Sequence, residues 1–102
     1  MTQLQRMAAA LLLSAGGAAL AQDANLGRNL AATCASCHGT NGQVRGDTVK
    51  PLAGMAAEQI VTSFNGFKTG ALPATIMHQI AKGYSNEQIT AIAAYFAAQA
   101  KK

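Results

Sequence analysis

The sequence predicts an all-α fold in one small domain. Apolar residues recur at the three- and four-residue spacing of amphipathic helices, at Ile60, Phe64 and Phe67 and again between Ile89 and Phe96. No stretch alternates polar and apolar residues as a half-buried strand does. No internal repeat is visible, and glycine or proline separates the helical segments.

The first 21 residues are typical of a secretory signal peptide. Arg6 supplies a positive charge, residues 7–21 are apolar and small, and Ala19-Leu20-Ala21 fits the A-x-A cleavage pattern. A retained membrane anchor is the alternative, but a serine and two glycines interrupt a run shorter than the roughly 20 apolar residues of a spanning helix. We therefore expect cleavage after Ala21, a periplasmic location without stable membrane insertion, and one domain over residues 22–102.

The composition favours a cofactor inside this domain. Tryptophan is absent and aromatic residues make up 5% of the chain, so few large side chains can fill a core that is marginal at this size. The formal charge is +4, but no arginine-rich run interleaves with aromatics, so we expect no nucleic-acid binding. No nucleophile–base pair, paired carboxylates or phosphate loop suggests that the chain catalyses a reaction.

The first helix is predicted to begin at a cap on Asp23 or Asn25 and to run through Leu26 and Leu30 to Cys34. Gly27 is unfavourable inside it by about 1 kcal/mol. This glycine marks either a close approach by another helix or a weak first turn.

The segment Cys34-Ala35-Ser36-Cys37-His38 carries the C-x-x-C-H pattern of covalent haem attachment. One helical turn places both thiols on one face, where each can add to a haem vinyl group, and His38 can then bind the iron. Three alternatives use the same residues. A thioredoxin-like motif needs a strand before the helix, a zinc site needs four ligands, and a disulfide suits an oxidising compartment.

Residues 39–54 contain four glycines and are predicted to form an irregular loop along one edge of the cofactor. Arg45 and Lys50 can lie near the haem propionates, although solvated charges are the more frequent outcome. A second helix is predicted from Ala56 to Lys68, with Gly70 as its stop signal.

Two helices follow. Pro73 suits the first position of a short helix that carries Met77 and closes at Gly83. Ser85 and Gln88 have the spacing of a capping box for a final helix that extends to about Ala100. We expect this helix to bury Ile89, Ile92, Ala93 and Phe96 and to present Lys101 and Lys102 to its negative end.

Four sequence features can be taken together: the C-x-x-C-H motif, the Pro51-Leu52-Ala53-Gly54 stretch, a later methionine and the Tyr95-Phe96 pair. In these four features the chain resembles the class I cytochrome c family. The resemblance spans nearly all of the mature chain. It implies the small class I cytochrome c fold, with helices packed around one covalently attached haem c (heme c) and one-electron transfer as the function.

The resemblance also implies a methionine as the distal iron ligand. Met77 stands where the family pattern puts it, His78 is second in rank and Met55 third, and ordinary core packing is the alternative for a methionine. We expect His78 to lie on the surface. In the family, the carbonyl of a proline accepts a hydrogen bond from the proximal histidine; here Lys50 holds that position and its carbonyl can serve equally.

Three segments are similar to the cytochrome subunits of flavocytochrome c sulfide dehydrogenases: Phe67-Lys68-Thr69-Gly70, Pro73-Ala74-Thr75-Ile76-Met77 and Ile80-Ala81-Lys82-Gly83-Tyr84-Ser85. This similarity implies a partner subunit that holds FAD and oxidises sulfide. Two alternatives keep the haem: a free-standing carrier of the c553 or c4 type that serves other redox proteins, and a haem sensor or enzyme with an open distal site. A disulfide- or metal-stabilised binding module without haem is a third.

Overall fold

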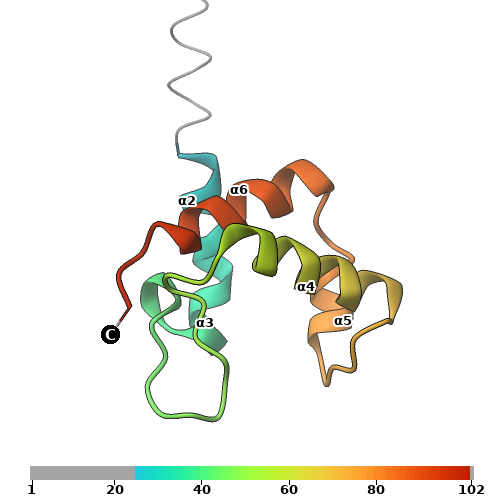
Figure 1. Ribbon diagram of the computed structural model, residues 1–102, viewed down its shortest axis with the longest axis horizontal. Coiled ribbons are helices and arrows are strands. Elements are labelled where there is room, and N and C mark those ends of the chain that lie inside the picture. The colour runs from blue at the N-terminus through green and yellow to red at the C-terminus, as the bar shows by residue number, and fades with distance from the viewer. Residues whose placement is uncertain (1–24, 102) are drawn as a thin grey trace, which may run out of the picture.

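The computed structural model describes residues 25–101, in which every regular element is an α-helix or a 3-10 helix. In chain order these are α2 (Leu26–Ala31), η1 (Ala32–Cys34), α3 (Ala35–His38), η2 (Thr40–Gly42), α4 (Ala57–Thr69), α5 (Met77–Ala81) and α6 (Asn86–Ala97) (Figure 1). The all-α prediction is confirmed. The expected signal peptide, its cleavage site and Lys102 lie outside the described residues.

The core lies where α6 packs against α2 on one side and α4 on the other, so the two ends of the domain meet (Figure 1). Its buried members all come from helices: Ala31, Ile60, Phe64, Ala81, Ile89, Ile92, Ala93 and Phe96. Only two of them are aromatic, as the composition predicted. No helix within residues 25–101 has the length and apolar character needed to cross a membrane.

The first predicted helix is divided into α2, η1 and α3, which continue from one to the next up to His38. Asn25 occupies the N-cap, but its side chain makes no capping hydrogen bond, so this part of the prediction is wrong. Its backbone is near helical (φ −104°, ψ −1°) and lacks the extended geometry that directs a capping side chain at the free N–H groups.

Gly27 lies at the closest approach of α2 to α6. A Cβ atom at this position would stand 2.3 Å from the carbonyl oxygen of Ala91 and 3.3 Å from the Cβ of Tyr95. The structure therefore decides between the two interpretations of this glycine. Gly27 marks a close approach, because the absence of a side chain lets the backbones of α2 and α6 touch.

Helix α4 begins and ends within one residue of the prediction, and Gly70 ends it in a left-handed conformation (φ 82°). Helix α6 begins with the predicted capping box: the Ser85 hydroxyl accepts from the N–H of Gln88 (3.2 Å), whose side chain accepts from the Ser85 N–H (2.9 Å). Its four predicted core residues are all buried. It ends at Ala97, earlier than the expected Ala100, because the backbone turns back there and Gln99 N–H donates to the Phe96 carbonyl at 3.1 Å.

Helix α5 begins at Met77, so the prediction of Pro73 as its first residue is wrong. Residues 71–76 instead form an irregular connection from α4, in which Leu72 N–H donates to the Gly66 carbonyl at 3.0 Å. This return hydrogen bond keeps the connection against α4 and leaves too few residues for an earlier helical start. After α5, the N–H of Gly83 donates to the Ile80 carbonyl at 3.1 Å.

Replacing Gly27 with alanine tests the contact between α2 and α6. Alanine favours a helix by about 1 kcal/mol, but its methyl group would overlap the Ala91 carbonyl. We expect Gly27→Ala to lower the free energy of unfolding of the haem-loaded protein by roughly 1–3 kcal/mol, as measured by urea denaturation. Gly83→Ala is the control, because its Cβ would find its nearest neighbour at 3.4 Å. A Gly27→Ala protein as stable as the unsubstituted chain would contradict the close contact.

Candidate functional site

The two thiols of the C-x-x-C-H motif lie one helical turn apart. Cys34 closes η1 and Cys37 lies in α3, so both side chains project from the same side of a continuous helical path. Cys34 is half-buried and packs against the core, Cys37 is exposed, and both thiols are free. Burial raises the pKa of the Cys34 thiol, a hydrogen bond with Thr33 opposes the rise, and neighbouring Cys37 adds to it. The Cys34 thiol is therefore protonated at neutral pH.

His38 is the last residue of α3, and its ring is oriented by the loop that follows. Nδ1 of His38 lies 2.8 Å from the backbone oxygen of Lys50. A carbonyl oxygen only accepts, so Nδ1 carries the proton and Nε2 keeps a free lone pair. The structure thus confirms that the Lys50 carbonyl takes the place of the proline carbonyl found in the family. The side chains of Lys50 and Arg45 are both exposed.

The loop that carries Lys50 is closed by a buried glycine. The carbonyl of Gly42 accepts hydrogen bonds from the N–H groups of Leu52 (3.0 Å) and Ala53 (3.2 Å). Gly42 itself has φ +75°, and a Cβ there would lie 2.8 Å from the Ala53 nitrogen and 2.9 Å from Cδ1 of Phe96. A second tie joins the tip of η2 to α6, because the Tyr95 hydroxyl donates to the Asn41 side chain.

Met77 opens α5, is half-buried and packs against the core cluster that Cys34 also contacts. In Figure 1, α3 and α5 both lie below α4, towards its two ends. The helices that carry the attachment segment and the predicted distal ligand thus lie on the same side of α4 in this view, and both Cys34 and Met77 contact the core. Met55 also packs against this core, just before α4 begins.

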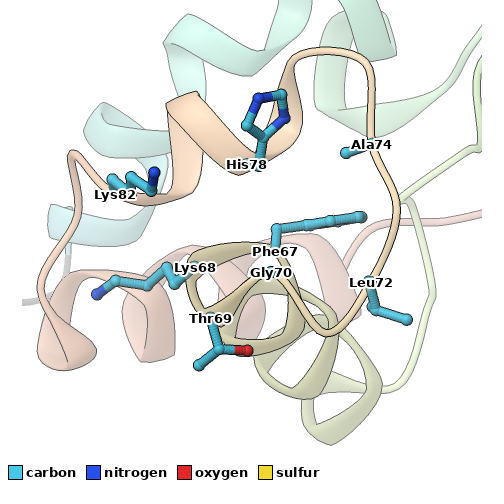
Figure 2. Close-up of a pocket in the computed structure, with 8 residues that line it drawn as sticks. All are labelled: Phe67, Lys68, Thr69, Gly70, Leu72, Ala74, His78 and Lys82. Carbon is cyan, nitrogen blue, oxygen red and sulfur yellow. The ribbon is translucent and has the colours of Figure 1, made fainter.

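His78 does not lie on the surface as predicted. It is half-buried, and its Nδ1 atom is shielded from solvent and has no hydrogen-bond partner among the described residues. The cause is the return of residues 71–76 along α4. This connection and α5 frame a hollow of about 290 Å³, with Phe67 from α4 across from His78 (Figure 2).

Apolar side chains stay exposed on this side of the molecule. Leu72 is 40%, Ile76 58% and Ile80 37% exposed, and all three lie in or just before α5. Leu26, at 40%, is the remaining large exposed apolar residue of the described part and belongs to α2. Three exposed apolar side chains therefore lie within five residues of the half-buried Met77 in the chain. We call these three residues the α5 patch.

Lys68 and Tyr84 make contacts that the sequence did not reveal. The Lys68 ammonium donates to the Tyr84 carbonyl at 2.7 Å, so it does not border the α5 patch as a free charge. The Tyr84 hydroxyl lies 3.0 Å from Oγ1 of Thr33, immediately before Cys34. The sole sequence signal for Tyr84 was its place before a capping box, which does not predict a partner 51 positions away.

Within residues 25–101, no group of three His, Cys, Asp or Glu side chains has an arrangement that could hold a metal ion. The donor set does fit a covalently bound haem. It comprises two thiols one turn apart, an adjacent imidazole with a free Nε2, and a half-buried thioether that packs against the same core as Cys34.

Comparisons with known proteins bear on the family of the chain. A family model described as cytochrome c matches residues 24–99. The chain is 40% identical over 76 residues to the cytochrome subunit of sulfide dehydrogenase from Chlorobaculum tepidum, covering 74% of this chain and 68% of the relative. It is 35% identical over 82 residues to cytochrome c-554(548) from Halomonas halodenitrificans, covering 78% and 99%. It is 34% identical over 67 residues to a thiosulfate dehydrogenase electron acceptor from Stutzerimonas stutzeri, covering 63% and 31%.

The importance of the loop for His38 can be tested with a matched pair of glycines. Gly42 and Gly46 both have positive φ, so alanine at either position costs roughly 1–2 kcal/mol in strain. Only at Gly42 would the methyl group meet neighbours, which adds about 1–3 kcal/mol. We expect Gly42→Ala, but not Gly46→Ala, to speed solvent exchange of the His38 Nδ1 proton, measured by NMR on the reduced protein. Equal exchange in the two variants would show that the loop closure does not hold the ring.

Proposed function

Since the chain belongs to the cytochrome c family, we propose that it carries single electrons between redox proteins of the periplasm, with Cys34 and Cys37 binding haem and His38 and Met77 binding iron. The family itself establishes covalent haem c and electron transfer without catalysis by this chain. The residue roles, the domain limits 22–102 and the periplasmic location belong to the proposal.

The observation that carries these roles is the hydrogen bond between His38 and Lys50. It holds the imidazole as the tautomer with a proton on Nδ1 and directs the lone pair of Nε2 away from the loop. Because a carbonyl oxygen accepts the Nδ1 proton, the ring is a stronger base at Nε2. The imidazole is therefore oriented before it meets a metal.

The other side chains attach the cofactor and exclude water. Thioether links at Cys34 and Cys37 would bind it to the end of η1 and to α3, and the apolar core that Cys34 and Met77 contact would limit the access of solvent. When bound, the haem supplies an iron that alternates between the ferric and ferrous states by one electron. A thioether ligand from Met77 raises its reduction potential relative to a second histidine.

Substitution of Met77 tests the distal assignment. Met77→Ala removes the only thioether in α5, so we expect loss of the weak near-infrared band of methionine-ligated ferric haem, a lower reduction potential and new binding of carbon monoxide. Met55→Ala is the control and should keep the band. Loss of the band in Met55→Ala with its retention in Met77→Ala would exchange the roles of the two methionines. Carbon monoxide binding by the unsubstituted protein would favour a sensor with an open distal site.

The partner that we propose is a flavoprotein subunit holding FAD that oxidises sulfide, docked over the α5 patch. A relative is named as the cytochrome subunit of sulfide dehydrogenase, and another as an electron acceptor of thiosulfate dehydrogenase, which supports a redox enzyme as donor. Three exposed apolar residues and one exposed lysine, Lys82, border α5. Such a surface suits a stable apolar interface more than a salt-steered encounter.

Reduction of the haem by its donor distinguishes this partner from the alternatives. We expect the tagged protein to recover a flavin-containing subunit from periplasm at moderately high salt, and sulfide, but not thiosulfate, to reduce the haem of that complex. Ile76→Lys should slow this reduction by roughly ten-fold, because it places a charge in the apolar contact. Leu26→Lys also replaces an exposed apolar residue with a charge, but it does so on α2, and it should leave the rate unchanged.

Two results would contradict the flavoprotein partner. Reduction by thiosulfate in place of sulfide would assign the donor to the second enzyme class. Purification of the cytochrome alone, with strongly salt-dependent electron transfer from small carriers, would favour the free-standing carrier. The second outcome is suggested by the match to 99% of the length of cytochrome c-554(548).

A further inference from the structure

Tyr84 lies in the turn between α5 and α6 and reaches the attachment segment. Its hydroxyl oxygen is 3.0 Å from Oγ1 of Thr33, the residue before Cys34. Thr33 Oγ1 also donates to the Leu30 carbonyl at 3.2 Å, and either hydroxyl of the Thr33–Tyr84 pair can be the donor. The two hydrogen bonds form a chain from the α5–α6 turn through Thr33 to α2.

Two hydrogen bonds hold the Tyr84 backbone, and one aromatic contact holds its ring. The Lys68 ammonium on α4 donates to the Tyr84 carbonyl at 2.7 Å, and the Tyr84 N–H donates to the Ala81 carbonyl at 3.3 Å. Its ring meets Phe64 of α4 edge to face, with centroids 6.2 Å apart and planes at 78°. These contacts connect the turn after α5 and the tyrosine ring to α4.

Among the side-chain hydrogen bonds of residues 25–101, the one between Tyr84 and Thr33 joins the segment 32–38 directly to the region 57–85. The other side-chain hydrogen bond that joins residues 32–38 to a later part of the chain runs from His38 to the Lys50 carbonyl in the loop. The position of α5 relative to the two cysteines therefore depends on the Tyr84 hydroxyl and on packing.

We propose that the Tyr84 hydroxyl is a positioning group that fixes α5, and with it Met77, relative to the Cys34–His38 segment, and so sets how firmly the Met77 sulfur stays on the iron. The proposal rests on Met77 as the distal ligand. Tyr84 does not itself touch the cofactor in this scheme. It acts through the turn that follows α5, where Tyr84 lies seven residues after Met77 in the chain.

Competition by imidazole measures this effect. Imidazole occupies the distal side of ferric haem only when the methionine has left, so its apparent affinity reports how readily the sulfur leaves. Tyr84→Phe keeps the ring against Phe64 and removes the hydroxyl alone. We expect imidazole to bind about two- to ten-fold more tightly to it, the equivalent of one hydrogen bond, while the haem stays attached.

The chain offers a matched control in Tyr95→Phe. This substitution also deletes a hydroxyl that is hydrogen-bonded to a side chain, at Asn41, but it lies on α6 and makes no link to α5. We expect its imidazole affinity to equal that of the unsubstituted protein. Thr33→Val should reproduce Tyr84→Phe, Thr33→Ser should restore the ordinary affinity, and the double variant Thr33→Val with Tyr84→Phe should bind imidazole no more tightly than either single variant.

Unchanged imidazole affinity in Tyr84→Phe, or an equal rise in Tyr95→Phe, would overturn the proposal. If Tyr84→Phe yields no haem-loaded protein, the comparison of Thr33→Val with Thr33→Ser decides in the same way. Failure of the Met77 assignment is seen separately, as a near-infrared band that persists in Met77→Ala. The tyrosine proposal fails when that band depends on Met77 and yet the hydroxyl variants bind imidazole as the unsubstituted protein does.

Discussion

The hydrogen bond from His38 Nδ1 to the Lys50 carbonyl is the interaction on which the rest of the site depends. It joins the end of α3 to the middle of the loop that follows, and so converts a flexible glycine-rich segment into a support for one imidazole. The loop can hold this position because Gly42 is buried beneath it and accepts two backbone N–H groups on its return. Only the backbone of Lys50 takes part, which explains how a lysine stands where the family has proline.

The helices around this interaction bury only a small apolar core. Two aromatic and three isoleucine side chains make up most of the buried core, and the remainder is alanine. Helices compensate by close approach, as at Gly27, where α2 and α6 meet backbone to backbone. A covalently bound haem, at the site that we propose beside Cys34 and Met77, would add apolar area that this small chain does not supply itself, so attachment and folding would depend on one another.

The helix that carries the proposed distal ligand, α5, is short and is held by contacts from other elements. Helix α5 spans only Met77 to Ala81, a length that is not stable alone in water. Its position comes from α4, from the return of residues 71–76 and from the turn at Tyr84. The same arrangement buries one side of His78 and exposes the α5 patch, so the surface offered to a partner is a consequence of how the distal ligand is supported.

The sequence by itself determined the features that depend on neighbouring residues. The periodicity at Ile60, Phe64 and Phe67 predicts α4, the Ser85–Gln88 pair predicts the start of α6, and the C-x-x-C-H motif predicts the haem site. Local rules failed where distant contacts outweigh them. Pro73 is a good first residue of a helix, yet the hydrogen bond between Leu72 and Gly66 holds the chain against α4 and moves the start to Met77. Only the tertiary structure brought the Lys50 carbonyl, which the sequence offered as a candidate, to 2.8 Å from His38 Nδ1. It alone showed that His78 is half-buried and that Tyr84 meets Thr33. Each of these contacts joins residues that chain folding brings together, and the energy of such contacts does not appear in any local sequence pattern.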